Sequence, residues 1–225
     1  MLKAKDLTSH GFQESAMPFS LDLPLLLATA SFAFVTSATP GPNNLMLLAS
    51  GANFGFRRTI PHMLGIVLGV ALLLALTLAG LGELFLRYPP SQWVLQVAGV
   101  SYLLWLSWKI ATAPVGELKA DEGAVEARPF SWWQAAAFQF LNPKAWMMAL
   151  AAISGFTLGG DLYLTSGLMV IVVFALVGLP AISLWAGFGV VLQQLLSSAR
   201  RQRLFNVTMG AMTAATAWVI VQVSV

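Results

Sequence analysis

The segment Ala38-Thr39-Pro40-Gly41-Pro42-Asn43-Asn44 interrupts the first long apolar run of the chain, which extends from Leu23 to about Phe54. A continuous helix over that run would be roughly 48 Å long, whereas the hydrocarbon core of a bilayer is ~30 Å thick. Proline removes a helical hydrogen bond, so two prolines and a glycine predict two half-helices. In lipid such a break survives only against protein or a watered cavity, which makes it a candidate binding site.

A half-helix that begins near Pro42 would direct its free N–H groups and the positive end of its dipole toward the break. That end suits a carboxylate, and the adjacent asparagines add donors and acceptors. The alternative is a simple proline kink, which is common in membrane helices. The candidate binding residues of this segment are Thr39, Pro40, Gly41, Pro42, Asn43 and Asn44.

The chain as a whole is too apolar for a water-soluble protein. Its 225 residues are 58% hydrophobic and only 9% charged, and the mean hydropathy is +0.77. A soluble domain usually carries about 25% charged residues. This composition excludes a soluble enzyme, a nucleic-acid binder and a disordered chain. At ~20 residues per span there is room for about six or seven transmembrane helices.

Runs free of charge predict an all-α integral membrane protein with six spans. The spans cover about 23–54, 62–82, 92–109, 131–157, 162–195 and 204–224. Residues 1–20 are expected to form a polar tail and 110–130 a hydrophilic cytoplasmic linker. Spans one to three therefore lie in 21–109 and spans four to six in 131–225. The first run is interpreted as an uncleaved helix because further spans follow, and Pro180 is expected to kink the overlong fifth span.

Basic residues predict the orientation, because cytoplasmic loops carry an excess of Lys and Arg. The loops after spans one, three and five hold eight of the twelve basic residues, namely Arg57, Arg58, Lys109, Lys119, Arg128, Arg200, Arg201 and Arg203. The opposite side holds Lys3, Lys5 and Arg87. Both termini are therefore expected outside.

A second break is predicted at Asn142-Pro143-Lys144 in the fourth span. Asparagine before proline is typical of an N-cap followed by the first residue of a helix. Lys144 is the only charged residue inside a predicted span, and an intramembrane charge is a functional hypothesis by default. A cation in the first turn opposes the helix dipole, so a substrate carboxylate is a candidate counter-ion. The alternatives are a lysine that snorkels and a loop.

The two predicted breaks also suggest an internal repeat. Each set of three spans opens with a broken helix and closes with a helix that bears an early glycine, Gly99 or Gly210. An odd number of spans per half gives the halves opposite orientations, as in the inverted repeats of many secondary transporters. Gly65 and Gly69 form a small-xxx-small pair, which favours close helix packing.

Several chemistries are excluded by the residues that the chain lacks. It contains no cysteine and two histidines, His10 and His62, so disulfides, thiolate metal sites, thiol relays and a bis-histidine haem are not expected. No metal site, cofactor or catalytic residue is predicted, because the spans hold neither paired carboxylates nor a nucleophile with a base. His62 is expected at a membrane boundary, where an interfacial role is favoured over proton uptake.

In this order, these motifs resemble those of the LysE/RhtB family of amino-acid exporters over residues 21–225. The motifs that carry the resemblance are Thr39 to Asn44, Gly55-Phe56-Arg57-Arg58, Gly65 with Gly69, Gly99 with Tyr102, Leu103 and Lys109, Asn142-Pro143-Lys144, and Gly210. Residues 108–114 and 55–58 look closest to the branch that exports cysteine and O-acetylserine. The lysine-exporter branch often has an acid where this chain has Val70, which favours a neutral substrate.

The resemblance implies a bacterial inner-membrane secondary transporter that exports a small neutral amino acid, driven by the proton motive force. The substrate type would be cysteine or O-acetylserine, homoserine or threonine, or leucine. The N-termini at Pro42 and Asn142 would bind its carboxylate, and the carbonyl groups near Thr39 to Gly41 its ammonium. The lipid bilayer is the expected surrounding, nucleic acid is not a partner, and a homodimer is a reasonable expectation.

Other functions stay open from sequence alone. An exporter of another small solute or of an ion belongs to the same superfamily, although an ion exporter needs midplane carboxylates that the predicted spans lack. A non-transporting membrane scaffold is the alternative from a different class. The proton carrier is also open: Lys144 or His62 can serve, or the membrane potential can act on a charged substrate.

Overall fold

The computed structural model describes residues 23–81, 87–113, 115, 128–196 and 198–223, and every regular element in them is helical. These elements are α1 (Leu23–Ala38), α2 (Pro42–Phe54), α3 (Phe56–Leu76), η1 (Thr77–Leu81), α5 (Pro89–Ala111), α6 (Trp132–Leu141), α7 (Pro143–Phe156), η2 (Gly160–Leu162), α8 (Tyr163–Leu195) and α9 (Ala199–Val223). The all-helical class is confirmed. The predicted polar tail 1–20 and most of the linker 110–130 lie outside the described residues.

The eight α-helices of the described chain exceed the six predicted spans because each expected break separates two helices. By length and hydropathy, two described segments can cross a membrane alone, Phe56–Leu81 and Gly160–Leu195. A third candidate is the pair α1 and α2, which are bent by 61° relative to each other. These apolar helices identify a multi-pass membrane protein.

The first break has the local geometry that its prolines predict. Gly41 is extended, with φ −178° and ψ 177°, and Pro42 occupies the start of α2. The second break is similar: Asn142 is extended, its side chain accepts a hydrogen bond from the Lys144 N–H, and Pro143 begins α7. Proline is favoured at this position because its missing N–H would be unpaired there in any case. The long α8, by contrast, continues as a helix through Pro180, and a kink there stays a prediction.

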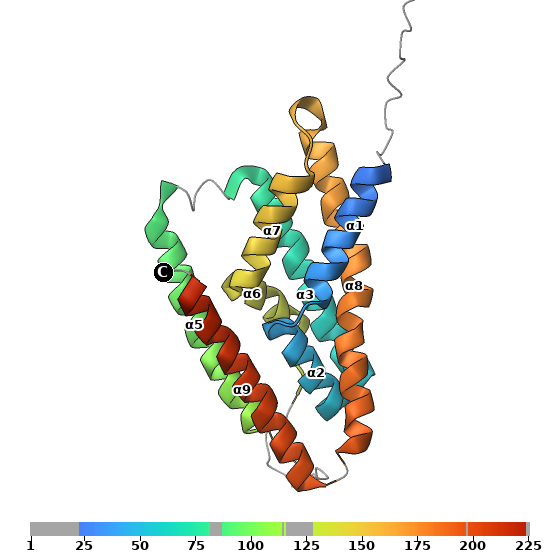
Figure 1. The fold of residues 1–225 in the computed structure, drawn as a ribbon, viewed down its shortest axis with the longest axis vertical. Helices are drawn as coiled ribbons and strands as arrows, with labels where there is room; N and C mark the ends of the chain where they lie inside the picture. Colours follow the sequence, from blue (N-terminus) through green and yellow to red (C-terminus); the bar gives the residue numbers. More distant parts are fainter. Residues whose placement is uncertain (1–22, 82–86, 114, 116–127, 197, 224–225) are drawn as a thin grey trace, which may run out of the picture.

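The helices run in opposite directions through the two breaks (Figure 1). The pair α1 and α2 descends from the upper to the lower end of the view, whereas α6 and α7 ascend. The two breaks lie about halfway along the bundle. Helix α8 packs against α1, α2 and α3, helix α6 packs against α3, and α5 pairs with α9. The α2–α3 and α8–α9 connections and the end of α5 share the lower end.

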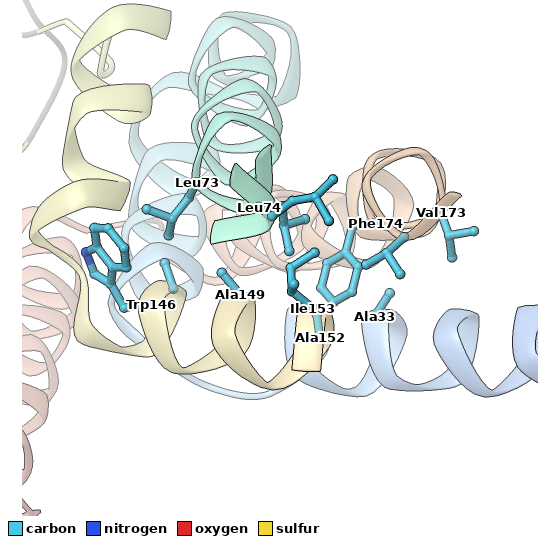
Figure 2. Packing of buried hydrophobic residues seen from close by; sticks show 12 residues of the cluster. Ala33, Leu73, Leu74, Trp146, Ala149, Ala152, Ile153, Val173 and Phe174 are labelled. Atoms are coloured by element: carbon cyan, nitrogen blue, oxygen red, sulfur yellow. The ribbon is translucent and has the colours of Figure 1, made fainter. Parts of the chain in front are cut away.

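The largest buried cluster joins α7 to α1, α3 and α8 (Figure 2). Ala145, Ala149 and Ala152 of α7 are at most 2% exposed, and they follow one face of the helix at i, i+4 and i+7. Small side chains on this face let Leu73 and Leu74 of α3 approach closely. The half of the fourth span that follows the Asn142 break is therefore held inside the bundle.

Large apolar side chains point outward on the same helices. Leu64, Leu68 and Leu72 follow one face of α3 and are 44–55% exposed. Trp108 of α5 and Leu176 of α8 are 70% exposed. Exposure of such an apolar surface to water is unfavourable, whereas contact with lipid chains is not. The apolar periphery is thus consistent with a bilayer as the surrounding solvent.

Glycines mark the places where helices approach most closely. A Cβ added at any of the four predicted packing glycines would lie 2.1–2.7 Å from a carbonyl oxygen of a facing helix: Gly65, Gly69, Gly99 and Gly210. The same holds for Gly51 and Gly189 between α2 and α8, which the sequence motifs did not predict as packing residues. Only a residue without a side chain permits this backbone separation.

Two glycines of α8 provide a matched test of this packing. A Cβ at Gly189 would lie 2.2 Å from the Leu48 carbonyl oxygen, whereas a Cβ at Gly187 meets nothing within 4 Å. We expect Gly189→Ala to destabilise the protein by about 1–3 kcal/mol through overpacking. Gly187→Ala should be neutral or stabilising by up to ~1 kcal/mol. Thermal unfolding in detergent measures both variants, and equal melting temperatures would contradict the α2–α8 contact.

Candidate functional site

The two helix breaks face each other at the centre of the bundle. Helices α2 and α7 both begin there, and helices α1 and α6 both end there. The centre therefore combines two positive and two negative helix ends. Such a place can hold an anion and a cation side by side.

Lys144 links the two breaks directly. Its Nζ donates hydrogen bonds to the carbonyl oxygens of Thr39, at 2.7 Å, and Pro40, at 3.4 Å. The lysine belongs to the first turn of α7, but its ammonium group reaches the carboxyl end of α1. A cation is unfavourable at a helix N-terminus and favourable at a C-terminus. The partner helix thus supplies the compensation that α7 itself does not.

This contact shows how the break carbonyls are occupied in the present conformation. Thr39 to Gly41 were predicted to bind the ammonium group of a substrate, with Lys144 paired to its carboxylate. In the structure the Thr39 and Pro40 carbonyl groups already accept hydrogen bonds from Lys144. Lys144 thus takes the place predicted for the substrate ammonium, and binding of a substrate there stays a prediction.

The other carbonyl groups at the end of α1 are also satisfied by side chains. Asn44 Nδ2 donates to the carbonyl oxygens of Ser37, at 2.8 Å, and Thr39, at 2.7 Å. The indole N–H of Trp185, on α8, donates to the Ala38 carbonyl at 3.0 Å. Thr39 accepts two bonds, which a carbonyl oxygen with two lone pairs permits. The carbonyl groups of residues 37 to 40 are therefore all paired.

Asn43 makes the second bridge between the two breaks, to Gln139 of α6. The Asn43 amide donates to Gln139 Oε1 at 2.8 Å, and the Gln139 amide donates back to Asn43 Oδ1 at 3.1 Å. Gln139 also donates to the Ala135 carbonyl at 2.8 Å, which uses both of its N–H donors. The sequence analysis did not predict Gln139 as a site residue. Its signal is a polar side chain in an apolar run, three residues before Asn142.

A cavity of about 40 Å³ lies between the breaks, enough for a few water molecules. Six of the predicted residues line it, namely Gly41, Pro42, Asn43, Asn44, Asn142 and Lys144, together with Gln139. Thr39 contributes its carbonyl group to Lys144, and Pro143 starts α7.

No acidic residue occurs in α1, α2, α6 or α7. Lys144 is consequently the only formal charge that these four helices bring to the site. Within the described residues no group of three His, Asp or Glu side chains can hold a metal ion. The described site is suited to hydrogen bonding and to one anionic group.

His62 is buried between helices rather than exposed on the surface of the bundle. The side chain is 1% exposed and lies inside the bundle on α3. Its ring stacks on Phe130, with the ring centroids 5.4 Å apart. His62 is therefore buried although Arg58 within one turn is exposed, because helix rotation, not sequence distance, decides exposure. Its place at a membrane boundary stays a prediction.

Comparisons with known proteins find similar sequences over most of the chain. Residues 34–222 match the model of the LysE type translocator family. The chain is 35% identical over 179 residues to the cysteine/O-acetylserine efflux protein of Escherichia coli strain K12, covering 79% of this chain and 89% of that protein. The proteins of the same name from Shigella flexneri and Escherichia coli O1:K1 / APEC are 35% and 34% identical over the same shares. No solved structure matches significantly.

The bridge from Asn43 to Gln139 can be tested by a double-mutant cycle. We expect Asn43→Ala and Gln139→Ala to destabilise less in combination than the sum of the single changes, by roughly 0.6–1.7 kcal/mol. Asn43→Ala combined with Gln193→Ala, at an exposed position of α8, serves as the additive control. Unfolding by denaturant in mixed micelles measures all variants. Additivity in both cycles would show that the amide pair contributes no coupling.

Proposed function

The chain belongs to the LysE-type translocator family, and from that premise we propose that it exports a small neutral amino acid of the cysteine or O-acetylserine type. The similarity to cysteine/O-acetylserine efflux proteins over most of both chains supports this substrate type. The single observation that carries the site is the contact between the Lys144 ammonium and the α1 carbonyl groups. It brings together a cation and an acceptor for a cation at one place.

An amino-acid zwitterion is the ligand that can replace both halves of this contact. Its carboxylate would bind Lys144 and the N–H groups that begin α2 and α7. Its ammonium group would take the place of Nζ on the Thr39 and Pro40 carbonyl groups. Lys144 would repel a cationic side chain on the substrate, and α1, α2, α6 and α7 contain no acidic residue that could bind it. A substrate with a cationic side chain is therefore disfavoured.

Substrate entry requires the breaks to move apart. The cavity of about 40 Å³ has room for only a few water molecules, and Lys144 occupies the carbonyl groups that the substrate ammonium would use. Transport would proceed by alternate exposure of this central site as the two halves rock against each other.

The proposed architecture is six spans in two inverted repeats of three. Helices α1 and α2 would correspond to α6 and α7, α3 to α8, and α5 to α9. The packing supports this assignment, because α1 on α8 has its counterpart in α6 on α3. The opposite directions of the two broken helices also fit it (Figure 1).

The proposed setting is the bacterial inner membrane, with basic connections in the cytoplasm, both termini outside and the proton motive force as the energy source. The homodimer expected for the family stays a prediction.

Counterflow in proteoliposomes tests the function. We expect vesicles that contain the purified protein and unlabelled cysteine to take up external radiolabelled cysteine faster than empty vesicles do. The chain contains no cysteine, so a reductant can keep the substrate thiol reduced without changing the protein. O-acetylserine should compete, and lysine should not. A scaffold would give uptake equal to that of empty vesicles.

Lys144→Met removes the charge but keeps the length and apolar stem of the side chain. Insertion should become easier, since a lysine at a helix centre costs ~2.5–3.5 kcal/mol on translocon scales. Counterflow should nevertheless be lost, and Lys144→Arg should restore it poorly because a guanidinium is larger and planar. Lys109→Met is the control, since Lys109 lies over the Trp105 ring at the end of α5. Full counterflow by Lys144→Met would show that Lys144 is not needed for transport and that the substrate carboxylate binds the helix N-termini alone.

Single cysteines in this cysteine-free chain test the orientation. Ser198 and Gly159 are exposed at opposite ends of α8. We expect Gly159→Cys to react with a membrane-impermeant maleimide on intact spheroplasts, and Ser198→Cys to react only after permeabilisation. The reverse labelling pattern would invert the proposed topology.

A further inference from the structure

His62 is the buried polar side chain that the site described above does not use. Its two ring nitrogens are the only buried side-chain nitrogen or oxygen atoms without a hydrogen-bond partner in the described part of the chain. The imidazole is 1% exposed and stacks on Phe130 with an angle of 30° between the rings. Met63, next in the chain, and Phe130 belong to one apolar cluster.

The described elements around α3 bring few charged or titratable groups toward this histidine. Helices α2 and α6 and the η1 turn contain none. Helix α7 contributes Lys144, which is bonded to Thr39, and α8 contributes Tyr163, which donates to the Leu78 carbonyl. The arginines near the start of α3 are exposed, as is Arg128 ahead of Phe130. No described carboxylate packs against the ring.

An imidazole in this position is costly in two ways. Its donor and its acceptor both lose water without gaining a partner. Protonation in place would add an isolated buried charge, which is far more unfavourable. A leucine or phenylalanine would fill the space at neither cost. The imidazole is therefore best explained by a second conformation in which its nitrogens reach water.

Polar side chains lie between His62 and the start of α3, where the exposed Arg57 and Arg58 are located. Thr59 lies one turn earlier on the same face of α3 and is fully buried. Its hydroxyl donates to the Gly55 carbonyl at 2.9 Å, which leaves the hydroxyl of Ser50 as donor to Thr59 Oγ1, also at 2.9 Å. A small separation of the helices here would admit water along hydroxyl groups rather than along apolar surface.

The ring that covers His62 is attached to a moving part of the proposed transport cycle. Phe130 immediately precedes Ser131, the N-cap of α6, and α6 is the first half of the second broken helix. A displacement of α6 from α3 would uncover the imidazole.

Resting on the proposed function, we propose that His62 binds the proton that is exchanged for the amino acid. In the present conformation the imidazole is uncharged and covered by Phe130. In the alternate conformation α6 has moved, water reaches a ring nitrogen, and that nitrogen takes up a proton from one side of the membrane. The protonated imidazole stays hydrated while the two halves rock and expose it to the other side, where it releases the proton before Phe130 covers the uncharged ring again. One proton is released for each amino acid that moves in the opposite direction.

His62→Gln separates proton coupling from transport itself. Proteoliposomes with an acidic interior are given equal radiolabelled cysteine on both sides, and valinomycin with K⁺ clamps the membrane potential. One pH unit should drive about tenfold accumulation by the unaltered protein in a one-to-one exchange. His62→Gln should lose this accumulation but retain counterflow, and the tail variant His10→Gln should keep both.

The outcomes distinguish the two proposals. Absence of counterflow in the unaltered protein would overturn the proposed function. Counterflow together with undiminished accumulation in His62→Gln would overturn the role of His62 alone. Loss of both activities in His62→Gln would make the histidine structural and overturn its role as well.

A second measurement needs no change at His62. In His10→Gln the remaining histidine is His62, so carbethoxylation by diethyl pyrocarbonate, followed by mass spectrometry, reports on this ring alone. We expect slow modification without substrate, faster modification during cysteine counterflow, and fast modification at rest in Phe130→Ala. A rate that is the same with and without counterflow would contradict an imidazole that becomes hydrated during transport.

Discussion

The carbonyl groups at the end of α1 have no helical partners, and the rest of the site is arranged around that constraint. In a bilayer each unpaired backbone group costs several kcal/mol. Residues 37 to 40 contribute four such carbonyl groups, and each accepts a hydrogen bond from a side chain on α2, α7 or α8. The break in one half of the chain is thus completed by Asn44 of the same half together with Lys144 and Trp185 of the other half.

The same atoms that stabilise the break also form the candidate binding site. A substrate that displaces Lys144 from the Thr39 and Pro40 carbonyl groups removes hydrogen bonds to a charged group, each worth roughly 1.5–3 kcal/mol. Only a ligand with its own ammonium and carboxylate returns both. A ligand with one of these groups would leave either the lysine or the carbonyl groups without a partner, and this asymmetry would be the physical basis for selecting the proposed zwitterion.

The sequence predicted the elements better than the contacts between them. Pro40, Pro42 and Pro143 act locally, so the positions of both breaks and the N-cap at Asn142 follow from backbone chemistry alone. The partner of Lys144 lies 105 residues away, and nothing in the local pattern specifies it. The role of Gln139 and the burial of His62 were not predicted for a related reason, since an apolar helix surrounded by protein and lipid gives little amphipathic signal to show which face is buried.

Helix α6 connects the two functional proposals. Gln139 near its end pairs with Asn43 beside the central cavity, and Phe130 just before its start covers His62. Nine residues of helix separate these contacts by roughly 13 Å. The central site holds no acidic residue, so an uncharged amino acid can pass without any titration there. In the proposed cycle Lys144 stays the counter-ion of the substrate and His62 carries the proton, so a short helix that contacts both places would transmit displacement from one to the other. In the proposed cycle such coupling would be reciprocal: a substrate that shifts α6 at Gln139 would alter the hydration of His62, and protonation of His62 would alter the affinity of the central site.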